Sequence, residues 1–232
     1  GIGTDASFSQ AIWVGVINLA FTLIAIALID KLGRRPLLLA GVAGMAICMF
    51  TLAYGFNQAE YSLDEESITL LPQTLQAPLR GDLAGQVFDN DVIYKSALRS
   101  SLGDELVKEH ESALIAAGAS MNTWLILFGI LGFVASFAVS IGPVMWVLFS
   151  ELFPNWIRGL AISFVGLVNS AVSFLVQVLF PWELDYLGSS TTFLIYGAFA
   201  ALGWVFIAWK LPETKGRSLE ELEKELVKET NE

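Results

Sequence analysis

Two asparagines stand in the middle of long apolar stretches of the sequence. Asn18 lies within residues 11–29, and Asn169 lies within residues 160–180. An amide buried in an apolar environment needs a hydrogen-bond partner. One interpretation is a hydrogen bond between two helices, which polar side chains commonly form in membranes. The other is that both amides face a water-filled cavity and bind the hydroxyl groups of a ligand. The residues alone do not decide between the two.

A second group of residues could bind a ligand through an aromatic ring. Residues 142–146 have the sequence GPVMW, in which Pro143 removes a backbone hydrogen bond and bends a helix. Such breaks are tolerated where the backbone lines a cavity. Trp146 offers an apolar ring face and one N–H donor, which suits stacking on a sugar ring. Phe137 lies nine residues earlier, so the two rings do not share one helix face closely. Packing against lipid or another helix is the alternative for both rings.

Catalytic and metal-binding motifs are missing from the sequence. It contains no GxSxG or HExxH motif and no phosphate-binding glycine loop. His110, the single histidine, has charged neighbours on both sides, as a solvated helix residue would. Cys48, the single cysteine, lies in an apolar run. The net charge of −10 argues against nucleic acid as a partner. We therefore expect no enzymatic activity, no metal site and no cofactor.

Five stretches are apolar and long enough to cross a membrane as helices. A span requires about 20 apolar residues. Of all residues 55% are hydrophobic, and long windows contain no Asp, Glu, Lys or Arg. This pattern predicts an all-α, polytopic membrane protein. The expected spans cover residues 11–29, 36–56, 124–149, 160–180 and 193–211.

Basic residues indicate how these spans are oriented. The turn between the first two spans, residues 30–35, has the sequence DKLGRR. Three cations in so short a loop hold it on the cytoplasmic side. Gly33 can adopt the positive φ that a tight connection between helices requires. Alternation then places residues 57–122 outside, and both Arg158 and the basic tail on the cytoplasmic side.

The outer segment, residues 57–122, is far longer than a usual connection between helices. Residues 62–65, with the sequence SLDE, resemble a capping box. Apolar spacing predicts one amphipathic helix over residues 92–102, stopped at Gly103, and a second one, capped by Asp104, that ends near Ala117. Whether the segment acts as a lid, a partner site or a tolerated insertion stays open.

Four motifs stand in order along the sequence: DKLGRR (30–35), GPVMW (142–146), SELFPNWIRG (150–159) and PETKG (212–216). Together they resemble the sugar porters of the major facilitator superfamily, in particular bacterial xylose– or hexose–proton symporters, which are related to the glucose facilitators. The resemblance implies helices eight to twelve of a twelve-helix transporter. We expect the chain to be the C-terminal half of a longer protein. Its expected divisions are helices eight and nine, a periplasmic helical insertion, helices ten to twelve and an amphipathic cytoplasmic tail, over residues 1–56, 57–122, 123–211 and 212–232.

The resemblance implies transport of a monosaccharide, a hexose or a pentose, by alternating access. Carried over position by position, the residues implied to bind sugar are Asn18, Phe137, Gly142, Trp146, Asn169 and Ser170. Ser170 departs from the family, which often has tryptophan there, so the identity of the sugar stays open. The symporters imply a proton as the coupling ion. An uncoupled facilitator and a non-transporting sugar sensor are the alternatives.

The resemblance also implies a salt-bridge network that holds the cytoplasmic helix ends together while the cavity opens outward. Its members here are Asp30, Arg34, Arg35, Glu151, Arg158 and Glu213. Exposed pairs contribute at most about 1 kcal/mol each, but several together can shift a two-state equilibrium. For Lys31 we expect only anchoring of the loop. The expected partners are the sugar, the lipid bilayer and the missing N-terminal half of the protein, in the inner (plasma) membrane.

Overall fold

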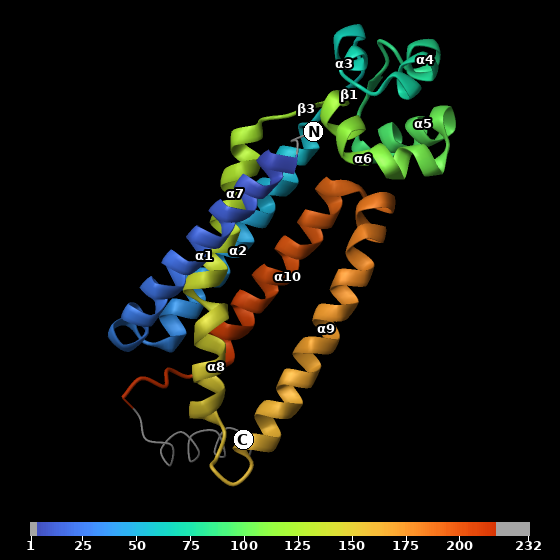
Figure 1. Cartoon of the computed structure of the whole chain (residues 1–232). Coiled ribbons are helices and arrows are strands. Elements are labelled where there is room, and N and C mark those ends of the chain that lie inside the picture. Colours follow the sequence, from blue (N-terminus) through green and yellow to red (C-terminus); the bar gives the residue numbers. More distant parts are fainter. Residues whose placement is uncertain (1–3, 217–232) are drawn as a thin grey trace. The chain divides into compact units, whose positions relative to one another are not determined.

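The computed structural model describes residues 4–216, with side chains from residue 11 onward, and most of these residues are helical (Figure 1). Among them, five stretches are long and apolar enough to cross a membrane. They lie in α1 (Thr4–Leu32), α2 (Arg34–Asn57), α7 with α8 (Thr123–Val139 and Ile141–Leu152), α9 (Arg158–Tyr186) and α10 (Gly188–Lys210). The five predicted spans are confirmed, and the chain is an all-α, polytopic membrane protein. The predicted helix of the tail lies outside the described residues.

The third span breaks earlier than the sequence suggested. Its two helices, α7 and α8, meet at Ser140, whose backbone has φ −125° and ψ −96°. Pro143 has no N–H to donate to the carbonyl of Val139, and its ring crowds that carbonyl. The break therefore falls three residues before the proline rather than within residues 142–146. The Ser140 hydroxyl donates a hydrogen bond to the Ser136 carbonyl (2.6 Å), which satisfies one backbone group next to the break.

The described residues form two compact units. The first contains residues 50–129 and 181–195 with the start of α1, and the second contains residues 14–49, 130–180 and 196–216. Most of the first unit is the segment between α2 and α7. This segment holds four helices, which gather in one cluster in Figure 1, and a small antiparallel sheet of strand order β2-β1-β3. The elements are β1 (Glu60–Ser62), α3 (Glu65–Thr69), α4 (Gln73–Asp82), β2 (Val87–Phe88), α5 (Asp91–Leu102), α6 (Asp104–Gly118) and β3 (Ala119–Ser120).

The two predicted helices of this segment are confirmed as α5 and α6, whereas α3, α4 and the strands were not predicted. The helix starts differ in detail. Ser62 belongs to β1, and the residue that caps α3 is Asp64, whose carboxylate accepts from the Ser67 N–H (2.8 Å). Asp104 does not cap α6 but is its first residue. Its carboxylate still favours the helix start, since it lies near the positive end of the helix dipole.

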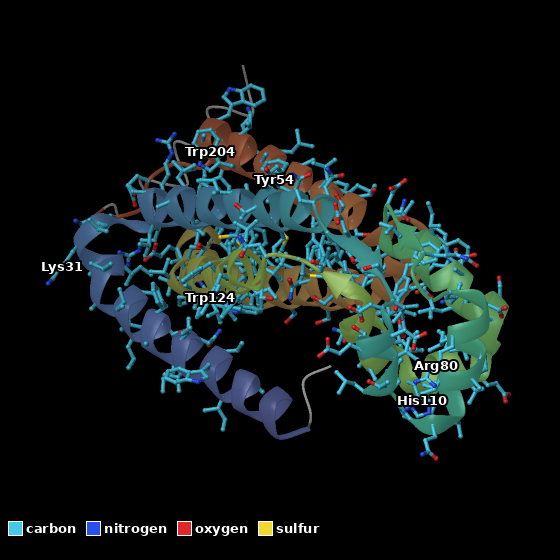
Figure 2. All side chains as sticks on the ribbon, turned by 90° about the horizontal axis from the view of Figure 1, so that it is seen from above. Lys31, Tyr54, Arg80, His110, Trp124 and Trp204 are labelled. Carbon is cyan, nitrogen blue, oxygen red and sulfur yellow. The ribbon has the colours of Figure 1, made fainter. Side chains whose placement is uncertain are left out.

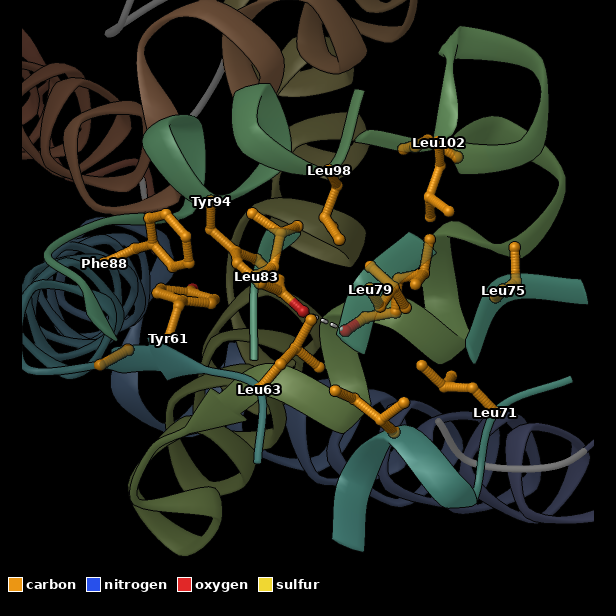
Figure 3. Close-up of a cluster of buried hydrophobic side chains, with 14 residues drawn as sticks. Tyr61, Leu63, Leu71, Leu75, Leu79, Leu83, Phe88, Tyr94, Leu98 and Leu102 are labelled. Carbon is orange, nitrogen blue, oxygen red and sulfur yellow. Dashed lines mark hydrogen bonds between the residues drawn. The ribbon is translucent and has the colours of Figure 1, made fainter. Parts of the chain in front are cut away.

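The first unit has an apolar core of its own (Figure 3). Buried leucines of α4 and α5 meet the rings of Tyr61, Phe88 and Tyr94, and Tyr61 stacks on Tyr94 with 5.4 Å between ring centroids. The Tyr94 hydroxyl is buried and donates to the Leu114 carbonyl (2.8 Å). Burying several large side chains stabilises such a segment because each contributes about 1.5–3 kcal/mol. Residues 57–122 are therefore a folded body rather than an open loop.

The second unit depends on close approach between helices. A Cβ atom on Gly41 of α2 would collide with the Ser140 side chain, so only glycine allows the observed packing. Trp204 of α10 donates its indole N–H to the Leu39 carbonyl of α2 (3.0 Å). One cluster of buried apolar residues in this unit lies where α1, α2 and α8 meet, and it contains Ile29, Leu37, Leu38, Val144 and Leu148.

Candidate functional site

The connection between α1 and α2 is built around Gly33. This residue has φ +98°, which favours glycine, and it lets α1 end at Leu32 and α2 begin at Arg34. A Cβ atom on Gly33 would lie 2.6 Å from the Glu213 carboxylate, which occupies that space. This carboxylate accepts hydrogen bonds from the backbone N–H groups of Arg34 (3.0 Å) and Arg35 (3.1 Å). Glu213 therefore caps α2 from a distant part of the chain, where free N–H groups and the helix dipole favour an anion.

Arg34 forms the centre of a charge cluster. Its guanidinium donates to both Glu151 oxygens, with a shortest distance of 2.7 Å, and to Asp30 (3.1 Å). The Arg34 side chain is 13% exposed, Glu151 25% and Asp30 80%. The pair with Glu151 is therefore shielded from water and the pair with Asp30 is not, so breaking the first by removing one partner costs more stability.

Thr214 completes this cluster and was not predicted. Its buried hydroxyl donates to Glu151 (2.6 Å). The signal that could have found it is its place in the motif PETKG, directly after Glu213. We name these residues the Arg34 cluster: Asp30, Arg34, Glu151, Glu213 and Thr214.

Two of the six predicted network residues lie outside this cluster. The Arg35 guanidinium donates to the Ala208 carbonyl (2.6 Å), so only the backbone of Arg35 contacts Glu213. The Arg158 guanidinium donates to the Phe153 carbonyl (3.2 Å), just after the end of α8. Neither arginine forms an ion pair with a described residue. One buried nitrogen on each, Nε of Arg35 and an Nη of Arg158, has no partner in the described part of the chain.

Lys31 and His110 both lie outside the Arg34 cluster, and His110 is less exposed than a solvated helix residue would be. Figure 2 shows Lys31 extending away from the ribbon at the connection between α1 and α2, and its side chain forms no ion pair with the residues the structure describes. Its carbonyl accepts a hydrogen bond from the Lys215 ammonium (2.6 Å). His110 lies half-buried at a kink of α6. Within the described residues, no group of three His, Cys, Asp or Glu side chains could hold a metal ion.

The residues implied to bind sugar lie on α1, α7, α8 and α9 of the second unit. Asn18 on α1 and Asn169 and Ser170 on α9 are exposed, and neither amide is hydrogen-bonded to another described residue. The helix–helix hydrogen bond that the sequence left open is thus not formed among these residues. An exposed amide in a membrane span needs water, a ligand or another part of the protein as its partner.

The aromatic candidates are also accessible. Phe137 is 40% exposed and Trp146 47%, and the Trp146 ring meets Phe149 edge-on at 6.1 Å between centroids. Gly142 stands in the first turn of α8, where a Cβ atom would contact Phe137 at 3.4 Å. The structure has a cavity of about 350 Å³ in the first unit, but none of the predicted sugar-binding residues lines it.

Three comparisons relate this geometry to known proteins. The profile of the family "Sugar (and other) transporter" matches residues 1–70 and 106–226. The D-xylose-proton symporter of Escherichia coli (strain K12) is 34% identical over 96% of this chain and 34% of its own length. The "Putative metabolite transport protein YwtG" of Bacillus subtilis (strain 168) is 32% identical over 97% of this chain and 37% of its own length.

Solved structures agree with these matches. A structure titled "Inward open conformation of the xylose transporter XylE from E. coli" matches with a TM-score of 0.62 and 32% identity, over 93% of this chain and 35% of that chain. A structure of a proton:xylose symporter of the major facilitator superfamily, bound to 6-bromo-6-deoxy-D-glucose, matches with a TM-score of 0.60 and 32% identity, over 97% and 36%. The chain thus spans about a third of the length of these relatives.

Proposed function

Because the chain belongs to the sugar transporter family of the major facilitator superfamily, we propose that its protein carries a monosaccharide across a membrane by alternating access. In this proposal the five membrane-spanning stretches are helices eight to twelve of the transporter, and an N-terminal half supplies the other helices. The substrate is a hexose or a pentose, since the relatives include a D-xylose-proton symporter. The membrane is the inner (plasma) membrane, with the α1–α2 connection and the tail on its cytoplasmic side.

The contacts of the Arg34 cluster are the main support for this proposal. It joins the α1–α2 connection, the end of α8 and the segment after α10 through one guanidinium and two carboxylates. Such a cluster can hold helix ends together in one state of a rocking transporter and release them in the other. A difference of a few kcal/mol between two states is enough to set their populations.

The exposed polar and aromatic residues of the second unit support a sugar site. Sugar hydroxyls both donate and accept hydrogen bonds, and the amides of Asn18 and Asn169 offer both kinds of partner. Trp146 and Phe137 present ring faces on which a sugar ring can stack. We assign ligand contact to these four residues, with Gly142 giving space beside Phe137 and Ser170 forming part of the wall next to Asn169.

The proposed coupling ion is a proton, and no other cofactor is part of the mechanism. No Asp, Glu, Lys, Arg or His side chain lies in the middle of the predicted spans of this chain. The proton-binding group would therefore belong to the N-terminal half, and a buried acid there would favour symport over facilitated diffusion.

Uptake by the full-length protein in proteoliposomes tests the function. We expect saturable uptake of a radiolabelled pentose or hexose, and faster uptake when an inward proton gradient is applied. An uptake rate that does not change with the proton gradient would favour a facilitator. Sugar binding without any flux would favour a sensor and overturn the transport proposal.

Two variants separate ligand contact from general damage. Asn169→Ala should raise the KM for the sugar about tenfold, because a sugar hydroxyl loses its partner in the site. Gln177→Ala removes an exposed amide elsewhere on the same helix and is the matched control. Equal KM values for the two variants would remove Asn169 from the site.

A further inference from the structure

One face of α5 carries three charged residues at helical spacing. Asp91, Lys95 and Arg99 are four residues apart, so their side chains lie in a row. The row contacts both sides of the connection between α9 and α10. Lys95 (3.1 Å) and Arg99 (2.9 Å) pair with the carboxylate of Asp185, in the last turn of α9.

Asp91 contacts the other side of this connection. Its carboxylate accepts from the N–H (2.8 Å) and the hydroxyl (2.6 Å) of Ser189, in the first turn of α10. We name these residues the Asp185 cluster: Asp91, Lys95, Arg99, Asp185 and Ser189. All of them lie in the first unit.

Burial and the helix dipoles both favour these contacts. Asp91 and the Lys95 side chain are 7% and 9% exposed, and buried charges persist only when they are paired. A carboxylate in the last turn of a helix opposes the helix dipole, so Asp185 requires compensation from its two cations. By contrast, the Asp91 carboxylate lies at the N-terminus of α10, where the dipole favours it.

Gly188 gives independent evidence that the connection fits α5. It has φ +79°, which disfavours any residue with a side chain. A Cβ atom at this position would lie 2.7 Å from the Asp91 carboxylate and 3.1 Å from the Val92 side chain. The absence of a side chain at residue 188 is therefore required by the approach of α5.

The same helix is anchored in the core of the first unit. Tyr94, beside Lys95, and Leu98 are fully buried there, and Leu102 is buried as well. Lys95 also pairs with Glu111 of α6 (2.9 Å). Burial by itself would lower the pKa of Lys95, but its hydrogen bonds to the two carboxylates outweigh this and raise it. Lys95 thus connects α6 to the end of α9.

We propose that residues 57–122 act as a strap that restrains the α9–α10 connection, with Asp185 as its anchor. The ends of both helices, residues 181–186 and 188–195, then move together with the segment as one body. This makes the segment a mechanical part of the molecule rather than a tolerated insertion. The proposal rests on the contacts of the first unit and not on sugar transport.

Hydrogen exchange in the full-length protein, embedded in lipid nanodiscs, tests the strap. Asp185→Asn removes the charge that Lys95 and Arg99 bind. We expect the backbone amides of residues 187–192 to exchange about tenfold faster, because the connection opens more often. Asp89→Asn makes the same charge change at an exposed residue of the segment and should leave the exchange unchanged.

Two further variants keep the test decisive if Asp185→Asn does not fold. Arg99→Gln leaves Lys95 in place and should give about threefold faster exchange of the same amides. Gly188→Ala should also accelerate their exchange, by pushing α5 away without changing any charge. Unchanged exchange in the folded variants would overturn the strap. Because exchange is measured without sugar, this outcome does not depend on the uptake experiment.

Discussion

The Arg34 cluster and the Asp185 cluster have opposite compositions. In the first, one arginine stands among the carboxylates of Asp30 and Glu151, while Glu213 caps the adjoining helix start. In the second, one aspartate stands between Lys95 and Arg99, and Asp91 caps a helix start. Each cluster therefore combines an ion pair with a capping carboxylate, and each restrains the connection between two consecutive membrane helices.

The two clusters differ in how far the family profile covers their residues. All five members of the Arg34 cluster stand in motifs on which the family resemblance rests, and the family profile matches all five. Three members of the Asp185 cluster stand on α5, inside residues 71–105, which the profile does not match. The Arg34 cluster therefore lies wholly within the part of the chain that the family profile matches. The Asp185 cluster accommodates a segment outside the family pattern.

The largest expected effect follows from removing the centre of the Arg34 cluster. Arg34→Met leaves the shielded Glu151 carboxylate without its cation, and we expect the free energy of unfolding to fall by about 2–3 kcal/mol. Thermal unfolding of the purified full-length protein measures this change. Lys31→Met removes a cation from the same connection but should change the stability by less than about 0.5 kcal/mol. Equal effects would mean that Arg34 only contributes to the net charge of the loop.

Thr214 allows a second test of the Arg34 cluster, through its hydrogen bond to Glu151. Thr214→Val keeps the shape of the buried side chain but removes the hydroxyl that donates to Glu151. We expect a loss of about 1–2 kcal/mol, since the acceptor is charged and stays bound to Arg34. In an Arg34→Met background, Thr214→Val should lower the free energy of unfolding by a different amount, because Arg34 and Thr214 both contact Glu151. Additive losses would show that the two contacts are independent.

The sequence predicts the membrane helices well, since length and lack of charge define them independently of tertiary contacts. It also predicts α5 and α6, whose apolar spacing and separating Gly103 are local features. It does not predict α3, α4 or the three strands, and α4 contains Pro78, a residue that argues against a helix. Elements of two to five residues show no period, and their position is decided by the core around Tyr61 and Tyr94.

The contacts of the candidate site also divide into those that the sequence predicts and those that it does not. Motif resemblance grouped Asp30, Arg34, Glu151 and Glu213, which do lie in contact. It could not show that the Arg158 guanidinium donates to a carbonyl instead. Side-chain direction depends on packing that no motif records. Asp185 pairs with residues 86 and 90 positions earlier. No sequence pattern marks so distant a pair when its partners are ordinary charged residues of an amphipathic helix.

Alkaline pH should weaken the Asp185 cluster through Lys95. The pKa of this lysine is raised in the folded protein, so its ion pairs stabilise fully below the unfolded value of about 10.4 and are lost as pH rises through the folded value. We expect the unfolding temperature of the wild type to exceed that of Lys95→Met at pH 8. The gap should shrink above about pH 10.4. A gap that stays constant up to pH 11.5 would mean that Lys95 acts by packing rather than by charge.

The smallest expected effect concerns the exposed pair of the Arg34 cluster. Asp30 is 80% exposed, and its contact with Arg34 is screened by water and salt. Asp30→Asn should therefore lower the free energy of unfolding by less than about 1 kcal/mol, and the loss should vanish at high salt. Glu151→Gln changes the shielded partner of the same arginine. It should lower the free energy of unfolding more than Asp30→Asn does, and this loss should persist at high salt. Chemical unfolding in urea at two salt concentrations measures both. If the two variants responded to salt alike, burial would not distinguish the two partners of Arg34.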